Sequence, residues 1–224
     1  MGEIGKVIQW HFSMLGLNLT LNAKTVIMSW LIMLFLIVFT LIATRKLKYI
    51  PGVFQSLAET IVQGFDKLVS DTLEMTDRKY FPFITALFLF LLLCNYIGVI
   101  PGCDEPTKDL NTPLGLGILG FVIAHYSGIK FKGIKNYLVE YLQPFFIMAP
   151  LNLIGEIAKV VSISFRLYGN IMGGSIIIIV VSHLVYSLVL PPFLYAFFGI
   201  FVGTVQAFVF TMLSLVYIAL QIKE

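Results

Sequence analysis

The stretch GEIAKVVSISFRLYGNIMGGS, from Gly155 to Ser175, places one arginine in the middle of a run that is otherwise fit for lipid. A guanidinium at the centre of a bilayer costs about 2.5–3.5 kcal/mol on insertion scales and about 10–17 kcal/mol in simulations of a lone helix. Arginine cannot avoid this cost by losing its proton. We therefore interpret Arg166 as a functional residue, against the alternative that it only reaches an interface or bridges two helices.

Helical periodicity gathers the polar and small residues of this stretch on one face. At about 100° per residue they fall within about 40° of Arg166, whereas the bulky apolar side chains lie elsewhere. The members of this polar stripe are Gly155, Lys159, Ser162, Arg166, Asn170 and Gly173. Because small residues allow a neighbouring helix to approach closely, we expect the stripe to face a protein partner or water rather than lipid.

The composition indicates a polytopic membrane protein. Of the 224 residues, 58% are hydrophobic and 12% are charged, which is too few charges for the surface of a soluble globule. The formal net charge of +3 is too small to indicate a nucleic-acid partner. Residues 1–25 lack the pattern of a cleaved signal peptide. The cysteines, Cys94 and Cys103, indicate neither a disulfide framework nor a metal site.

Five apolar segments are predicted to cross the membrane, which gives an all-α integral membrane protein. The predicted spans are residues 26–43, 80–100, 114–126, 151–190 and 193–220. An unbroken helix over the fourth segment would be about 60 Å long, so we expect it to tilt strongly, bend or partly emerge from hydrocarbon about 30 Å thick. Residues 53–72 are too polar to cross and are predicted to form an amphipathic interfacial helix.

The basic residues at the ends of the spans set the predicted orientation. A basic cluster within residues 45–48 follows the first span, lysines follow the third, and Lys223 ends the last, whereas the loop after the second span is acidic. Basic loops mark the cytoplasmic side, so we expect the N-terminus outside and the C-terminus in the cytoplasm. Because no transit-peptide pattern precedes the first span, we expect the plasma (inner) membrane of a bacterium, with an organelle-encoded chain as the alternative. Residues 1–25 would form an outer or interfacial segment, and residues 26–224 a single membrane domain.

The last span offers a partner for the polar stripe. Gln206 lies at membrane depth and shares a helical face with Gly199 and Gly203. We therefore expect the long helix that carries Arg166 to pack against this span. Gln206 either forms a hydrogen bond between two helices, which is worth about 0.6 kcal/mol in membranes, or lines a channel.

Several motifs together resemble subunit a of the F-type ATP synthase membrane sector. They are RLYGN at residues 166–170, QAFVF within the last span, NYIGVIPG at residues 95–102 and PLNLIGEIAK at residues 150–159, with matching span order from about Tyr80 to the C-terminus. The resemblance implies a stator proton channel whose two half-channels meet a rotating ring of c subunits. Arg166 would lower the pKa of each passing ring carboxylate and would block direct proton transfer between the half-channels.

The resemblance also implies roles for other polar residues. Asn170 and Gln206 would line the region of Arg166, and Asn95 would face the outer half-channel. Glu156 and Ser162 would lie along the cytoplasmic exit path. Glu156 points about 80° away from the stripe, however, so pairing with Lys159 as an interfacial charge is the alternative.

The chain departs from the family at the outer half-channel. Several members carry an ionisable pair at the positions that here hold Ser175 and Gly199. We expect water together with Ser175, Asn95 or His183 to substitute for that pair. His183 is predicted equally well to be an outer-interface histidine.

The implied partners are the ring of c subunits, the peripheral stalk of b subunits, the rest of the F-type ATP synthase and the lipid bilayer. The chain itself would be non-catalytic, without cofactor or metal, and partners would handle the nucleotide because no glycine-rich phosphate loop is present. A stand-alone secondary transporter in which Arg166 binds an anionic substrate is an alternative, but it predicts repeated halves that the sequence does not show. An intramembrane serine hydrolase would need Ser175 and His183, which lie about 12 Å apart along one helix.

Overall fold

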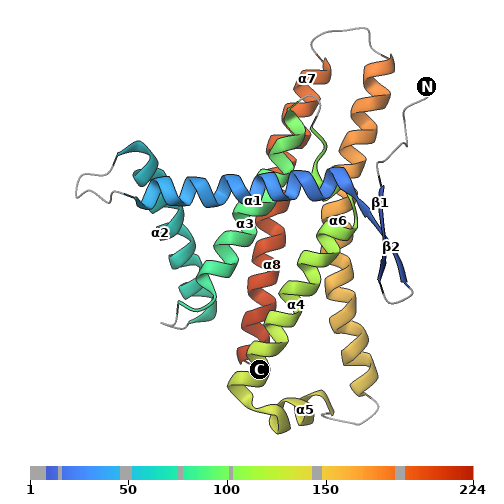
Figure 1. Ribbon diagram of the computed structural model, residues 1–224. Coiled ribbons are helices and arrows are strands. Elements are labelled where there is room, and N and C mark those ends of the chain that lie inside the picture. The colour runs from blue at the N-terminus through green and yellow to red at the C-terminus, as the bar shows by residue number, and fades with distance from the viewer. Residues whose placement is uncertain are drawn as a thin grey trace.

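The structure is a computed structural model that describes residues 9–14, 17–45, 52–74, 78–100, 103–142, 148–184 and 190–223. Helices make up most of these residues, and a short β-hairpin precedes them (Figure 1). The strands are β1 (Gln9–Met14) and β2 (Leu17–Asn22). The helices are α1 (Ala23–Thr44), α2 (Val53–Leu73), α3 (Phe81–Tyr96), α4 (Asn111–Lys132), α5 (Ile134–Leu142), α6 (Met148–Leu184), α7 (Leu190–Tyr195) and α8 (Gly203–Lys223). A π-helical stretch, Ala196–Val202, joins α7 to α8.

The predicted membrane-spanning helices are confirmed. Within the described ranges, five helices are long and apolar enough to cross a bilayer: α1, α3 with its last turn, α4, α6 and the continuous stretch from α7 to α8. The third is longer than predicted because the helix continues through polar residues at both ends of the apolar segment. The amphipathic helix predicted at residues 53–72 is α2.

Helix α6 is the longest element. Its 37 residues give a rod of roughly 55 Å at 1.5 Å per residue. The described part of α6 reaches Leu184, and residues 185–189 of the predicted fourth span lie outside the described residues. Pro191 and Pro192 lie in the first turn of α7, where a missing backbone N–H is tolerated.

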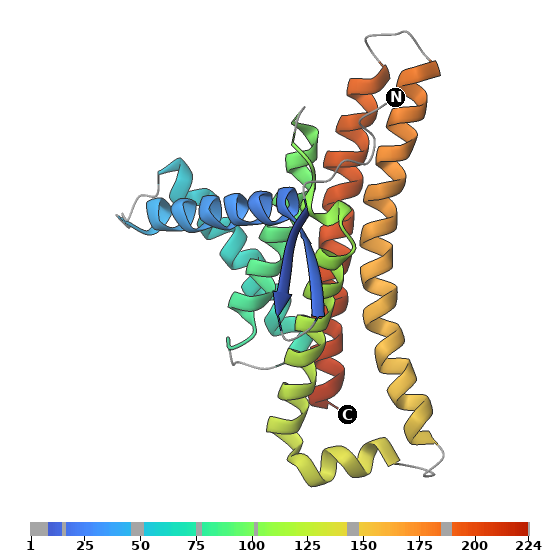
Figure 2. The same ribbon diagram turned by 45° about the vertical axis from the view of Figure 1, so that its right-hand side comes forward.

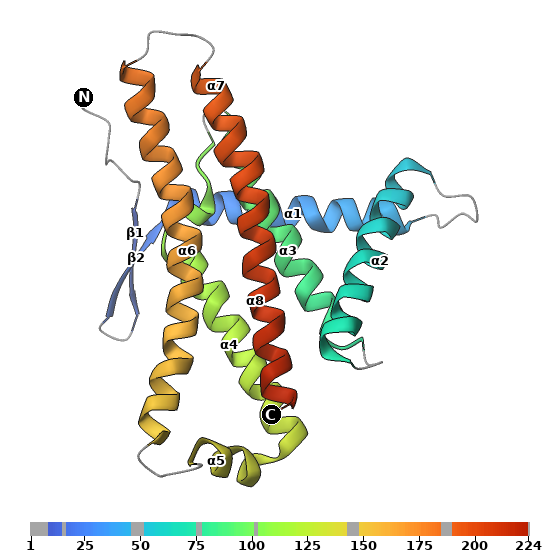
Figure 3. The ribbon, with the colours of Figure 1, turned by 180° about the vertical axis from the view of Figure 1, so that it is seen from behind.

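The core is built around α8, which lies between the other helices. One buried cluster joins α8 to α2, α3 and α4, with Ile84, Leu215 and Ile218 at its centre. A second joins α8 to α3 and α6 through Leu167 and Phe210. Figure 3 shows α6 and α8 side by side along much of their length, so the predicted packing of the long helix against the last helix is confirmed.

Helix α1 runs crosswise to this bundle. Figure 1 and Figure 2 both show it lying across the direction of α6 and α8, and α2 lies beside the end of α1 that is farther from α6. Among the membrane-spanning helices, α1 is the most apolar and the least buried by the rest of the chain. The bundle and α1 therefore cannot both stand upright in one bilayer.

The hairpin ahead of α1 was not predicted. Strands β1 and β2 are antiparallel, with Gln9 opposite Asn22 and Met14 opposite Leu17. The sequence LNLTLN alternates apolar and polar residues, a period of two that favours a strand over a helix. The interfacial segment expected at residues 1–25 therefore contains β-structure, whereas the membrane-spanning part is all-α.

Candidate functional site

Arg166 lies near the middle of α6, on a face that the rest of the chain leaves open. Its side chain is exposed, and among the described residues its guanidinium forms neither a hydrogen bond nor an ion pair. On the other side of the helix, Ile163, Leu167 and Ile171 are buried against α3 and α8. The described part of the chain therefore supplies the arginine with no counter-ion.

The glycines around Arg166 also face open space. A Cβ added at Gly155, Gly169 or Gly173 would meet nothing within 4 Å. By contrast, a Cβ at Gly174 would lie 2.9 Å from Cδ1 of Phe198. Gly174 thus serves packing within the chain. Gly169 and Gly173 leave room beside the arginine for a neighbouring molecule, and Gly155 leaves similar room about 16 Å further back along α6.

Asn170 and Gln206 join α6 to α8 beside the arginine. Nδ2 of Asn170 donates a hydrogen bond of 2.7 Å to Oε1 of Gln206. Gln206 is only 4% exposed, and its Nε2 is a buried donor without an acceptor among the described residues. A buried donor without a partner costs about 1–3 kcal/mol, so this amide is placed to donate to water or to a group from another molecule.

A cavity of about 310 Å³ lies between the loop after α3, the distal half of α6 and the π-helical stretch before α8. We call it the outer cavity, because it lies towards the end of α6 that is predicted to face outwards. Ser175 and Gly199 both line it, so the two positions that lack the ionisable pair face the same space. Ser175 is nine residues beyond Arg166, about 13.5 Å along the helix axis.

Asn95 is fully buried and does not line the outer cavity. Its Nδ2 donates to the carbonyl oxygen of Gly203 over 2.9 Å, and its Oδ1 accepts from Oγ1 of Thr107 over 2.9 Å. A Cβ at Gly203 would lie 2.9 Å from Cβ of Asn95, so this close approach of α3 to α8 requires glycine. Asn95 thus holds together α3, α8 and the loop between α3 and α4.

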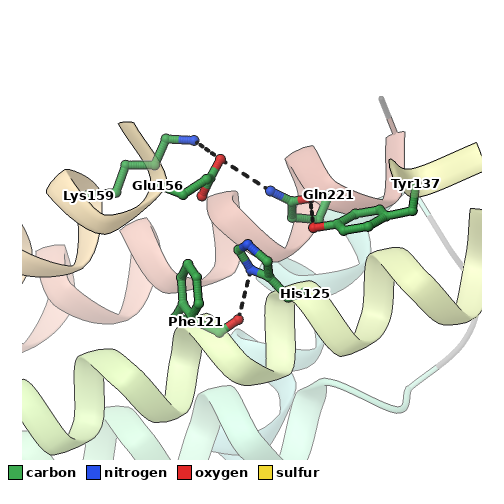
Figure 4. A network of polar contacts seen from close by, with 6 residues as sticks. All are labelled: Phe121, His125, Tyr137, Glu156, Lys159 and Gln221. Carbon is green, nitrogen blue, oxygen red and sulfur yellow. Dashed lines mark hydrogen bonds and ion pairs between the residues drawn. The ribbon is translucent and has the colours of Figure 1, made fainter. Parts of the chain in front are cut away.

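A network of polar side chains lies near the opposite end of α6 (Figure 4). Lys159 Nζ and Gln221 Nε2 both donate to Oε1 of Glu156, over 2.6 and 3.3 Å. The Tyr137 hydroxyl donates to Oε1 of Gln221 over 2.9 Å. The ion pair between Glu156 and Lys159 that the sequence allowed is therefore present. The network connects α5, α6 and α8.

His125 on α4 borders this network (Figure 4). Its Nδ1 lies 3.1 Å from the carbonyl oxygen of Phe121, and its ring is edge-on to that of Tyr137 at 6.2 Å between centroids. A small cavity of about 20 Å³ is lined by His125, Glu156 and Gln221 among others. That volume is enough for about one water molecule.

Two further predicted site residues, Ser162 and His183, lie apart from these two cavities. Ser162 is exposed on the face of Arg166 and lines neither cavity. His183 is exposed near the end of α6, with Nδ1 2.9 Å from the carbonyl oxygen of Ile179. The Ser175 hydroxyl donates to the carbonyl oxygen of Ile171 over 3.0 Å. Ser175 and His183 therefore do not form the hydrogen-bonded pair that a serine hydrolase would need.

Sequence reasoning missed two ionisable residues at these cavities. Glu105 lines the outer cavity from the loop after α3, and His125 lines the small cavity from the C-terminal end of the predicted third span. The acidic loop and a lone histidine in an apolar segment were the available signals. Neither signal indicates which cavity the side chain lines, because the cavities form between segments that are distant in the sequence.

Comparison with known proteins gives a consistent result. A family model described as ATP synthase A chain matches residues 26–219. The chain is 37% identical to ATP synthase subunit a 1 of Crocosphaera subtropica over 95% of this chain and 90% of the relative. It is 35% identical to ATP synthase subunit a of Moorella thermoacetica over 88% and 89% of the two chains. It is also 35% identical to that of Geobacter sulfurreducens, over 91% and 89%.

Proposed function

Because this chain belongs to the ATP synthase subunit a family, we propose that it is the stator proton channel of an F-type ATP synthase. Two half-channels, open to opposite sides of the membrane, meet a rotating ring of c subunits, and a peripheral stalk of b subunits holds the chain in place. The chain has no active site of its own. Proton flow along its face turns the ring and so drives ATP synthesis in another part of the complex.

The observation that carries this proposal is the unpaired, exposed guanidinium of Arg166. It lies in a helix fit for lipid, where an uncompensated arginine costs at least about 2.5 kcal/mol. Because the described chain provides no carboxylate for it, the counter-ion comes from another molecule. A membrane-embedded carboxylate on each c subunit meets this need, and the fixed cation lowers the pKa of that carboxylate as it passes.

The open glycines beside Arg166 fit a close helical neighbour. Gly169 and Gly173 have nothing within 4 Å of an added Cβ, so a ring helix can approach the backbone of α6 there. Asn170 and the free Nε2 of Gln206 lie at the same place and supply polar contacts. The stator surface is therefore the open face of α6 around Arg166.

The two cavities support two separate half-channels. The outer cavity reaches Ser175, about 13.5 Å beyond Arg166 along α6, and the network of Glu156 lies about 15 Å before it. Ser162 lies one turn before Arg166 on the path towards that network. The arginine thus separates the two paths, because a fixed positive charge repels a proton that would pass directly between them. Each proton that crosses 100 mV releases about 2.3 kcal/mol.

We place α1 upright across the bilayer, since it is the most apolar and the least covered of the spans. The long helices α6 and α8 run crosswise to it and are then strongly tilted (Figure 2). Tilting keeps a rod of about 55 Å within hydrocarbon about 30 Å thick. Residues 26–224 form one membrane domain in this arrangement, and residues 1–25 lie at the outer surface.

The orientation follows from the basic residues. Lys130 and Lys132 end α4 and Lys223 ends α8, at the same end of the bundle (Figure 1). Arg45 follows the last residue of α1, the helix that we place upright, so under the positive-inside rule that end of α1 is cytoplasmic and the N-terminus is outside. Five spans then put the C-terminus in the cytoplasm. The three relatives named above come from bacteria, which supports the bacterial inner membrane as the location.

A reversible disulfide between stator and ring tests the proposal. In a complex whose native Cys94 and Cys103 are replaced by serine, Gly169→Cys is paired with cysteines scanned along the c-subunit helix. We expect cross-linking that blocks ATP-driven proton pumping, and recovery of pumping after reduction.

The matched control is Ser164→Cys on the same helix. Ser164 is fully buried and donates to the carbonyl oxygen of Pro113, so it should not cross-link to the ring. A complex that assembles but forms no cross-link from Gly169→Cys, or one that pumps while cross-linked, would contradict the proposal.

A further inference from the structure

We propose that Glu105 is the proton-accepting group of the outer cavity and takes the place of the ionisable pair that is missing at Ser175 and Gly199. The inference rests on the proton-channel function proposed above. In each cycle the Glu105 carboxylate accepts a proton from a hydronium ion in the outer water, so that one O–H bond of hydronium breaks, one forms on the carboxyl, and a water molecule is left. It then releases that proton to water beside Ser175 and regains its negative charge.

The outer cavity brings Glu105 to the two altered positions although it is far from them in sequence. The cavity is lined jointly by the loop after α3 and by Ser175 and Gly199. Its volume of about 310 Å³ exceeds the room that a single water needs by an order of magnitude. The Glu105 carboxyl therefore lines the same cavity as Ser175, the position at which several family members carry an acidic residue.

Glu105 is the unengaged acid of this cavity. The charged side chains that line it are Lys24, Asp104, Glu105 and Lys108. Lys24 Nζ pairs with Oδ2 of Asp104 at 3.2 Å. Glu105, in contrast, has neither an ion pair nor a side-chain hydrogen bond among the described residues. Its carboxylate is thus available to exchange a proton with water.

The loop that carries Glu105 is fixed in place by buried residues. Pro106 and Thr107 are buried directly after it, and Thr107 is hydrogen-bonded to Asn95. The Glu105 carboxyl also packs against Gly98, in the space that a Cβ at that position would take. The small residue at position 98 therefore leaves room for the carboxyl in its present position.

The electrostatic environment raises the pKa of the Glu105 carboxyl. Burial raises the pKa of the Glu105 carboxyl above its ordinary value, Lys108 lowers that pKa, and Asp104 raises it. A raised pKa brings a carboxyl closer to the pH at which it both accepts and releases protons readily. Glu105 is partly buried because the residues directly after it, Pro106 and Thr107, are buried and hold the loop in place.

The test uses the complete complex in inverted membrane vesicles, with ATP-driven acidification and ATP synthesis as readouts. We expect Glu105→Gln to assemble normally and to lower both rates by about a hundredfold or more, the lower end of the range for loss of a proton-transfer group. Asp109→Asn is the matched control, because Asp109 is an acid of the same loop that does not line the outer cavity. It should keep both rates within about twofold of the parent.

A relocated carboxylate distinguishes proton transfer from a structural role. We expect Ser175→Glu, added to Glu105→Gln, to restore pumping and to shift the pH at which the rate is half-maximal. An assembled Glu105→Gln complex that pumps normally, or a double variant that restores nothing, would overturn the inference. If Glu105→Gln does not assemble, the pH profile of Glu105→Asp decides, and an unshifted profile would count against the inference.

Arg166→Ala, measured in parallel, separates this inference from the proposed function. If Arg166→Ala abolishes pumping while Glu105→Gln pumps normally, the channel function stands and the role of Glu105 is wrong. If Arg166→Ala pumps normally, the proposed function itself fails.

Discussion

Asn95 and Gln206 are both buried amides on membrane helices, but the structure satisfies them to different degrees. The two ends of the Asn95 amide bind Gly203 and Thr107. Gln206 is bound only at its oxygen, and its nitrogen has no acceptor among the described residues. Asn95 is therefore suited to hold the fold together, whereas Gln206 keeps a donor free for water or a partner.

This difference predicts opposite effects of the same substitution. Asn95→Leu leaves the buried Thr107 hydroxyl without its acceptor and should lower the stability of the chain by about 1–3 kcal/mol. Gln206→Leu removes one interhelical hydrogen bond worth about 0.6 kcal/mol and should leave stability nearly unchanged while lowering coupled pumping. Thermal unfolding of the two purified variants in detergent measures the contrast. Equal destabilisation would show that Gln206 is structural.

Glu105 predicts a pH dependence of stability. Its pKa is raised in the folded chain by burial, so its contribution to stability is complete below the unfolded pKa of about 4.3 and is lost as the pH rises through the folded pKa. Glu105→Gln stays neutral throughout. We expect the variant to match the parent in Tm near about pH 4 and to exceed it near about pH 8. A Tm difference that does not change with pH would contradict the raised pKa.

Helix α6 has one face that packs within its own chain and one face that the described residues leave open. The packed face contains Leu167 and Ile171, which contact α8, and Gly174, which contacts the segment before α8. The open face contains Arg166 and Gly173. Adjacent glycines on one helix thus have different physical roles, and the difference provides a matched pair of substitutions.

Gly173→Leu and Gly174→Leu should fail in different ways. A side chain at Gly174 collides with Phe198, so we expect that variant to be destabilised and poorly incorporated into membranes. A side chain at Gly173 meets nothing within 4 Å, so that variant should fold and insert but impair coupled pumping by obstructing the ring. Membrane abundance and pumping of the two variants measure this. Normal pumping by Gly173→Leu would argue against a close ring contact there.

At the scale of the whole molecule, the sequence predicted which segments are helices better than how they are arranged. Apolar length predicted the five spans, and the period of 3.6 predicted the open face of α6 and its contact with α8. Hydropathy contains no information on the angle between helices, so the crosswise course of α1 was not predictable. The position of Glu105 depends on a loop pinned through Asn95, a long-range contact that no local pattern encodes.

The central claim is that Arg166 separates two proton paths at a rotating interface. The most direct measurement is proton flux in inverted vesicles that carry the complex with Arg166→Ala, recorded as ATP-driven acidification and as passive leak after the catalytic sector is stripped away. We predict loss of driven pumping with normal assembly, and a passive leak that is retained or increased because the charge barrier is gone. Driven pumping at the parental rate would contradict the claim and would leave Arg166 as a structural residue.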